Sequence, residues 1–430
     1  MLAIIGFCMI FVLVALLILK KSIPPILFTI LPVIAALIAG FSIFEVGEFA
    51  SAGIKSMIST VSLFVFSISF FSLMSDEGVF DFLVGKLAPL AGNSVTAVMM
   101  ITAVVAVIAH LDGSGATTLL ITIPAMLPFY KKYKIRPQAL MLITITALGV
   151  MNMVPWGGPT IRAATVIGMD AGDLWRPLIP VQGIALILTL VEAFIIAKIE
   201  IRHGACLQAD VQTEETSVDA QTTNKAKLLV NFILTIVTIA ILMSDILPSN
   251  FVFMIATAVG LIINIRAPKE QSERLKKYGA SAMSMTTTLL TAGIFVGILN
   301  NSGMIDAMAT SIVNVIPEAL GAYTFIIIAI FSVPLIMCLG TDSFYYGLMP
   351  VVIGVAGTYG VPAEIVARAL IITENIGIGV SPVTPTIYLG LGLLDMDIGT
   401  HIRYSALWIW GLSIIMLFVS IIMGVIPVRF

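Results

Sequence analysis

The sequence predicts an all-α polytopic membrane protein with about ten transmembrane helices and two re-entrant hairpins, arranged as an inverted repeat. Hydrophobic residues make up 59% of the 430-residue chain and charged residues only 11%, whereas soluble proteins contain about 25% charged residues. Apolar runs reach about twenty residues, which suits a membrane-spanning helix and not the alternating strands of a β-barrel. The second half of the chain also repeats features of the first half.

The repeat is visible in residues that recur at a nearly constant spacing. Pro124 recurs as Pro350, and the pair Pro159-Thr160 recurs as Pro385-Thr386, both 226 positions later. The other recurrences are Tyr133 as Tyr359 at 226, and Gly78 and Asp81 as Gly303 and Asp306 at 225. Secondary transporters use such duplications to build one site from two broken segments.

Each half of the chain contains five apolar spans. They lie near residues 4–19, 25–41, 57–74, 139–166 and 178–197, and near residues 228–247, 251–265, 283–299, 365–394 and 404–426. The third and fourth spans of each half are separated by two shorter pieces, 95–109 with 116–129 and 322–337 with 344–356. Pieces of about 15 residues cover roughly 22 Å of a hydrocarbon core of roughly 30 Å, so re-entrant hairpins fit better than full crossings.

The predicted domain organisation follows from these spans. The first repeat covers 1–200, with a hairpin at 92–130 and a broken helix at 137–168, and the second covers 227–430, with a hairpin at 318–358 and a broken helix at 362–394. The polar stretch 201–226 between them predicts a flexible cytoplasmic linker. Residues 267–278 are expected to form a charged cytoplasmic loop, and 81–90 and 306–316 to form amphipathic interfacial helices.

Basic residues orient the chain in the bilayer. Those on one predicted side are Lys20, Lys21, Lys131, Lys132, Lys134, Arg136, Lys198, Arg202, Lys225, Lys227, Arg266, Lys269, Arg274, Lys276 and Lys277. The other side keeps mainly Lys55, Arg176 and Arg429. The positive-inside rule then opens the first hairpin toward the cytoplasm. Because five spans per half is an odd number, the second repeat inserts upside down, and we expect the two hairpin tips to meet near the midplane. Two full helices in place of each hairpin would leave every connection on the same side of the membrane, so charge alone does not distinguish the two arrangements.

Two further observations exclude other classes of protein. The three cysteines are scattered and form no close pair, which argues against a disulfide framework or a thiolate metal site. The formal net charge of -2 gives no indication of a nucleic-acid partner.

The first polar segment, 110–118, predicts a hairpin tip that binds an anion at the start of the returning helix. Its candidate binding residues are Asp112, Gly113, Ser114, Gly115, Thr117 and Thr118. The glycines permit tight turning, and the other side chains supply oxygens. Alternatively, Asp112 or Ser114 merely caps the helix. His110 is either a proton carrier or a packed, hydrogen-bonded residue.

The second polar segment, 151–162, lies within an apolar span and predicts an unwound helix. Its candidate binding residues are Asn152, Trp156, Gly157, Gly158, Pro159, Thr160 and Arg162. Prolines and glycines so close together free backbone groups that need partners in a dry environment, although a simple proline kink is the alternative. Arg162 either attracts a carboxylate or snorkels to the interface.

The repeat supplies a second tip, 339–350, and a second break, 373–388. Their candidate binding residues are Thr341, Asp342, Ser343, Asn375, Ser381, Pro382 and Thr384. Asp342 follows Asp112 by 230 positions and not 226, so the two carboxylates are not assumed to be equivalent. Glu374 is costly at membrane depth if it is charged and unpaired. We expect it to be protonated, paired with a residue such as Arg368, used for proton coupling, or purely structural.

At these residues the chain resembles the citrate-metal:proton symporter family, CitMHS, of the ion transporter superfamily. The resemblance rests on H-L-D-G-S-G-A-T-T at 110–118, G-V-M-N-M-V-P-W-G-G-P-T-I-R-A-A at 149–164 and D-S-F-Y-Y-G-L-M-P at 342–350. It implies proton-driven import of citrate complexed with a divalent cation, Mg²⁺ or Ca²⁺, through a bacterial inner membrane. It also implies an elevator-type fold with a dimeric scaffold, and no cofactor apart from the cation of the substrate.

Two departures from the family pattern alter charge at the expected site. D-G-S-G replaces D-G-D-G at 112–115, and E-N-I-G-I-G at 374–379 replaces a histidine-containing segment. We expect Asp112 and Asp342 to contact the metal of the complex, and Glu374 or His110 to carry the coupling proton. Free citrate carries about three negative charges, and the core segments offer only Arg162 and Arg368 as cations, so a chelated metal suits the site.

Three alternatives stand beside this interpretation. A sodium-coupled di- or tricarboxylate carrier, or another organic-anion carrier, of the same superfamily would hold sodium at the hairpin tips. An intramembrane aspartyl protease would use Asp112 and Asp342, but Gly340-Thr341-Asp342 lacks the first glycine of Gly-x-Gly-Asp. A passive channel suits two opposed hairpins less well than alternating access does.

Overall fold

The computed structural model describes residues 1–19, 21–87, 90, 94–206, 225–244, 246–314, 318–382 and 384–428, and these contain helices and no strands. Most of the predicted linker, at 207–224, lies outside the described residues. So do Lys20 and Arg429 of the charge argument, the predicted start of the first hairpin at 92, and the predicted end of the second amphipathic segment at 316.

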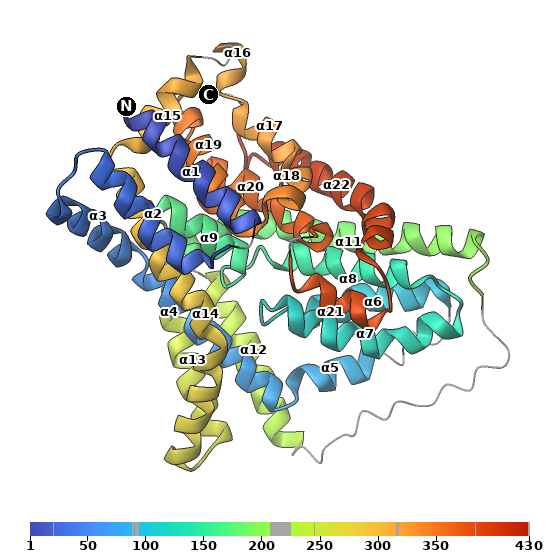
Figure 1. The fold of residues 1–430 in the computed structure, drawn as a ribbon. Helices are drawn as coiled ribbons and strands as arrows, with labels where there is room; N and C mark the ends of the chain where they lie inside the picture. The colour runs from blue at the N-terminus through green and yellow to red at the C-terminus, as the bar shows by residue number, and fades with distance from the viewer. Residues whose placement is uncertain are drawn as a thin grey trace.

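One group of helices packs around a long central helix, on the left and lower side of Figure 1. Its members are α1 (Leu2–Ile18), α2 (Pro24–Ile38), α3 (Ile43–Ser56), α4 (Ile58–Asp76), α12 (Lys225–Ser244), α13 (Ser249–Asn264), α14 (Pro268–Asn301) and α15 (Met304–Val313). The central helix α14 packs against α2, α3 and α4, and α13 lies between α4 and α12. We call these helices the first group.

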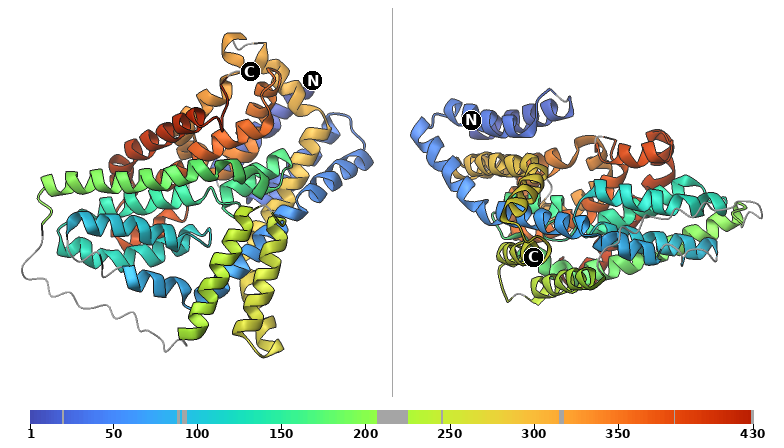
Figure 2. Two further views of the ribbon diagram at one scale, coloured as in Figure 1. Left: turned by 180° about the vertical axis from the view of Figure 1, so that it is seen from behind. Right: turned by 90° about the horizontal axis from the view of Figure 1, so that it is seen from below.

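A second group contains both glycine- and proline-rich breaks, and both views of Figure 2 show it beside the first group. Its members are α6 (Val95–Ala109), α7 (Gly115–Lys132), α8 (Pro137–Met151), α9 (Gly158–Ile167), α11 (Ile179–Arg202), α17 (Thr324–Ile330), α18 (Ser332–Leu339), η3 (Ser343–Leu348), α19 (Met349–Gly357), α20 (Ala363–Gly377), η4 (Ile378–Val380), α21 (Ile387–Leu393) and α22 (Ile398–Ile422). Helix α8 lies among α6, α7, α11, α20 and α22. Two short helices, α5 (Val79–Leu87) and α16 (Glu318–Gly321), connect the first group to the second. The short α10 (Ala171–Trp175) and η2 (Arg176–Leu178) connect α9 to α11 within the second group.

Glycines allow α3 and α14 to approach closely. A Cβ atom on Gly53 would lie 1.9 Å from the carbonyl oxygen of Gly293, and one on Gly297 would lie 2.4 Å from that of Phe49. Small residues of this kind permit backbone contact between membrane helices. Sequence reasoning made no prediction for α3, although Ser42 and Glu45 form a capping box at its start.

The prediction of a loop at 267–278 is wrong, whereas its cytoplasmic location stays a prediction. These residues belong almost entirely to α14, which runs without interruption over 34 residues. Asp76 at the end of α4 anchors this charged extension, because its carboxylate accepts hydrogen bonds from Lys277 and Tyr278, both at 2.9 Å. Glu, Gln, Arg and Lys are good helix formers, so a polar composition does not distinguish an exposed helix from a loop.

Four helices in the described part of the chain are long and apolar enough to cross a membrane: Ile58–Asp76, Ala226–Ser244, Ala282–Asn301 and Ile398–Ile422. A fifth is gained if Ser332–Leu339 and Ser343–Gly357, which meet at a bend of 111°, count as one broken span. Other apolar helices, including α6 and α8, have 10–17 residues. The chain is therefore a helical, multi-pass membrane protein, whereas the count of about ten spans and the inverted repeat stay predictions.

Candidate functional site

The first hairpin tip connects α6 to α7 through a tight turn. Gly113 has a φ of +72°, in the left-handed region that favours glycine. The Ser114 hydroxyl accepts a hydrogen bond from the backbone N–H of Thr117 at 3.3 Å, and Asp112 Oδ1 accepts one from the backbone N–H of Ser114 at 2.8 Å. Ser114 therefore caps the start of α7, as the capping alternative proposed. One oxygen of Asp112 is used within the turn.

His110 joins this tip to the first break. The side chain is fully buried, with Nδ1 2.6 Å from the Thr118 hydroxyl and Nε2 3.0 Å from Oδ1 of Asn152. Both ring nitrogens thus have partners, as expected for a packed, hydrogen-bonded histidine. This geometry fits the structural alternative for His110, and proton transfer by it stays a prediction.

Side chains of the first break hold its own shape. The break separates α8 from α9, and the Thr160 hydroxyl donates to the carbonyl oxygens of Asn152 and Met153 at 3.2 and 3.0 Å. The Trp156 indole N–H donates to the Leu111 carbonyl of the tip at 2.9 Å. A Cβ atom on Gly157 would lie 2.1 Å from the Asn152 carbonyl oxygen, so only glycine fits there.

An ion pair connects the first break to the second tip. Arg162 Nε on α9 donates to Asp342 Oδ1, immediately before η3, at 2.7 Å. Their side chains are 15% and 26% exposed. The guanidinium of Arg162 thus has a carboxylate partner from the protein itself, and its position relative to the membrane interface stays a prediction. The two residues are 180 positions apart in the sequence.

The second break contains buried polar atoms without partners. Glu374 is fully buried, and its Oε2 accepts a hydrogen bond from the Tyr345 hydroxyl at 2.8 Å, while its Oε1 has no partner. Arg368 and Glu374 are six positions apart on α20, which corresponds to about 240° of rotation and places their side chains on different faces of the helix. The suggested pairing of Glu374 with Arg368 is therefore wrong. The Ser343 hydroxyl and both amide atoms of Asn375 are also buried without partners. Such atoms are rare in proteins and often mark a ligand site.

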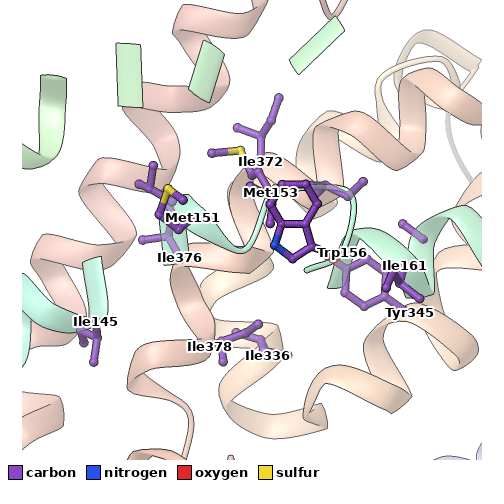
Figure 3. Packing of buried hydrophobic residues seen from close by; sticks show 14 of the residues in the cluster. Ile145, Met151, Met153, Trp156, Ile161, Ile336, Tyr345, Ile372, Ile376 and Ile378 are labelled. Carbon is purple, nitrogen blue, oxygen red and sulfur yellow. The ribbon is translucent and has the colours of Figure 1, made fainter. Parts of the chain in front are cut away.

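The two tips and the two breaks meet in one region of the second group. A Cβ atom on Gly115 would lie 3.2 Å from Cγ2 of Thr386, so the first tip touches the second break. The Ser381 hydroxyl of the second break donates to the carbonyl of Ile336 on α18 at 3.0 Å. Figure 3 shows buried side chains of this region, among them Met153 of the first break and Ile372 of α20, which belong to one hydrophobic cluster.

The remaining candidate residues make hydrogen bonds within their own segments, begin a helix, or lie half-buried near the tips. The Pro382 carbonyl accepts from the Tyr388 hydroxyl at 2.7 Å, and the backbone N–H of Thr384 donates to the Ser381 carbonyl at 3.2 Å. Gly158 and Pro159 begin α9, and Thr117 and Thr341 are half-buried near the tips. Among the described residues, no three His, Cys, Asp or Glu side chains are grouped so as to hold a metal ion.

Sequence reasoning missed two residues of this region. Tyr345 is the hydrogen-bond partner of Glu374, and His401 of α22 lies 2.9 Å from the carbonyl oxygen of Gly379 in the second break. Tyr345 lies in the motif D-S-F-Y-Y-G-L-M-P, but its side chain was not selected. His401 is distant from every motif, so its sequence position gave no signal.

A family model and curated relatives show the family of this chain, and a solved structure shows a similar fold. The family model for CitMHS citrate transporters matches residues 14–373. The chain is 33% identical over 426 residues to a citrate transporter of Bacillus subtilis (strain 168), covering 99% of this chain and 100% of the relative. It is 32% identical to a Mg(2+)/citrate complex secondary transporter of the same organism, over the full length of both. The YdaH transporter of Alcanivorax borkumensis has a similar fold, with a TM-score of 0.60 at 16% identity over 88% of this chain and 87% of that one.

Proposed function

The chain belongs to the CitMHS citrate transporter family, and on this basis we propose that it imports citrate as a complex with a divalent cation, by symport with protons. It is a transporter and not an enzyme, since the family and its relatives are transporters. The intramembrane protease alternative is thereby wrong. We place the protein in a bacterial cytoplasmic membrane.

The ion pair between Arg162 and Asp342 carries the proposal for a chelated substrate. A metal-citrate complex presents a cation and carboxylates together, so Asp342 contacts the metal while Arg162 binds a carboxylate. Free citrate would satisfy Arg162 and leave Asp342 facing negative charge, and a free metal ion would leave Arg162 unpaired. Separating a partly buried ion pair is costly unless both partners are replaced at once. The pair thus favours the complex over either component.

Neighbouring groups complete the proposed substrate site. The Ser343 hydroxyl and the side-chain N–H groups of Asn375 are free to donate to citrate oxygens, and the start of α7 offers the backbone N–H of Gly115. We assign the metal contact on this side to the carboxylate of Asp112, whose Oδ1 also accepts from the Ser114 backbone N–H. The proposed substrate contacts further include Gly113, Ser114, Thr117, Thr118, Asn152, Trp156, Gly157, Gly158, Pro159, Thr160, Thr341, Ser381, Pro382 and Thr384.

Proton coupling is assigned to Glu374, with His110 as the second choice. Glu374 has an unpartnered oxygen within the proposed site, whereas both nitrogens of His110 are already bonded. Protonation of Glu374 would remove a charge beside the incoming carboxylates.

The conformational change is proposed to be an elevator motion of the second group of helices against the first, which forms the dimer scaffold. Both tips and both breaks belong to the second group, so the proposed site would move as one unit. The domain boundaries at 200 and 227 and the inverted relation of the halves are part of this proposal.

Uptake of radiolabelled citrate into proteoliposomes under an imposed proton gradient tests the proposed function. We expect little uptake without divalent ions and strong uptake with either Mg²⁺ or Ca²⁺, and the more active ion identifies the substrate complex. Uptake that is inhibited by metal and driven by sodium would establish the sodium-coupled alternative. A protonophore provides the control for the driving force.

A further inference from the structure

Helix α11 contains a buried carboxylic acid that the proposed transport site does not use. Glu192 lies near the middle of the 24-residue helix and is only 5% exposed. Neither of its carboxylate oxygens has a hydrogen-bond partner. At membrane depth an ionisable residue in this state is expected to have a function.

The elements packed against α11 supply no charge to neutralise Glu192. Helices α6 and α8 contain no ionisable residue within their bounds. On α22 the ionisable residues His401, Arg403 and Tyr404 lie in the first two turns, and the Tyr404 hydroxyl donates to Glu200. On η2 the ionisable residue is Arg176, which pairs with Asp173. Near the end of α11 itself lie Lys198, Glu200 and Arg202, and Glu200 pairs with Arg136.

Glu192 lines a hollow of about 460 Å³ between α11 and α22. The other side chains that line it are apolar, among them Leu188, Ile195, Trp408 and Leu412. Sodium, magnesium or calcium would need about six oxygen ligands, which this hollow does not contain. A proton needs only the carboxylate itself. The chemistry of the hollow therefore selects a proton as the ligand.

We propose that Glu192 is a proton-binding site of the transporter, separate from the citrate site. The protonated acid is a hydrogen-bond donor, and the Thr146 hydroxyl of α8 is the polar group beside it. Thr146 lies five positions before the end of α8 at the first break. One turn further along α8, Gln182 of α11 donates to the Val150 carbonyl at 3.1 Å. Loss of the proton alters the contact of α11 with α8 directly beside the citrate site.

Labelling with dicyclohexylcarbodiimide tests the site without any transport measurement. The reagent is apolar, and the O–H of a protonated carboxylic acid adds across its C=N bond. The acyl group then shifts to nitrogen and leaves a stable N-acylurea, with no group lost. The full-length protein in liposomes is labelled from about pH 5 to about pH 9 and analysed by peptide mass spectrometry.

We expect an adduct on the peptide that contains Glu192, with a yield that falls at least about tenfold as the pH rises over this range. The Glu192→Gln variant should lack this adduct. Glu200 on the same helix is the internal control, since its carboxylate is engaged by Arg136 and we expect no adduct there. No adduct at Glu192 at any pH, or a yield independent of pH, would overturn the proposal.

A transport measurement tests the coupling, which rests on the proposed proton symport. In Glu192→Gln we expect citrate uptake driven by a pH gradient to fall about tenfold, while exchange of internal for external citrate continues. Glu192→Asp should restore the gradient-driven uptake. Gradient-driven uptake that is equal in Glu192→Gln and wild type would overturn the coupling. Wild-type uptake that does not depend on the pH gradient would instead refute the proposed symport. The labelling experiment would still decide whether Glu192 binds a proton.

Discussion

The two halves of the proposed site differ in how far the protein satisfies its own polar groups. Around the first tip and break, His110, Trp156 and Thr160 all have hydrogen-bond partners. Around the second, polar atoms of Ser343 and Asn375 are buried without partners. A self-satisfied segment needs no ligand to hold its shape, whereas unpartnered buried groups gain stability when a ligand binds. We infer that the first half is a preformed frame from which Asp112 and Arg162 contact the substrate, and that the second half depends more on the substrate for its hydrogen bonds.

The largest expected effect is on the ion pair that joins the two halves. Asp342→Asn leaves Arg162 without its carboxylate and removes the proposed metal contact, so citrate uptake should fall at least about a hundredfold. Uptake of citrate with Mg²⁺ into proteoliposomes measures this. The double variant Arg162→Gln/Asp342→Asn controls for stability, because it removes both charges together. Uptake unchanged in Asp342→Asn would exclude the residue from the site.

Two neighbouring glycines test the frame itself. A methyl group at Gly157 would meet the rigid Asn152 carbonyl at 2.1 Å, whereas one at Gly158 would meet only the Arg162 guanidinium at 2.9 Å, which can shift. We expect Gly157→Ala to reduce uptake tens of times more than Gly158→Ala, with both variants inserted normally in the membrane. Larger substitutions, Gly157→Leu and Gly158→Leu, should both abolish uptake. Normal transport in both leucine variants would contradict a broken-helix site.

Glu374 tests whether the second half carries the proton. Glu374→Gln keeps an acceptor for the Tyr345 hydroxyl but cannot titrate. We expect uptake driven by a pH gradient to fall about tenfold, and citrate exchange to weaken too, because the unpartnered oxygen faces the proposed substrate. Measuring both at several pH values separates Glu374 from Glu192, whose replacement should spare exchange. An unaltered response to the gradient would exclude Glu374 as the proton carrier.

The smallest expected effects distinguish two asparagines. Asn375→Leu removes an amide with no partner, so the unfolding temperature in detergent should not fall, whereas uptake should decrease several-fold. Asn152→Leu removes a partner of His110, and its unfolding temperature should fall by an amount equivalent to about 1–3 kcal/mol. Thermal unfolding followed by circular dichroism measures both. The reverse order of stabilities would contradict the contrast between the two halves.

The class of protein and the position of both breaks could be predicted from the amino-acid sequence alone. A bilayer accepts this composition and a water-soluble core does not, and prolines and glycines interrupt a helix through the backbone within a turn of their own position. For the same reason Asp112, Asn152 and Glu374 were recognisable as polar residues within apolar segments. These properties depend on neighbouring residues alone, so sequence reasoning reaches them.

Which of these residues contact one another depends on the packing of helices that are distant in the sequence. The pairing of Arg162 with Asp342 and of Tyr345 with Glu374 depends on how α9, η3 and α20 pack, and no local pattern encodes that packing. Glu192 lies in a predicted span but was not singled out from the sequence. Its lack of a charged partner depends on α6, α8 and α22, which pack against α11 and bring no cation to it. Local chemistry fixes what a residue can do, and long-range packing fixes whether a partner is present.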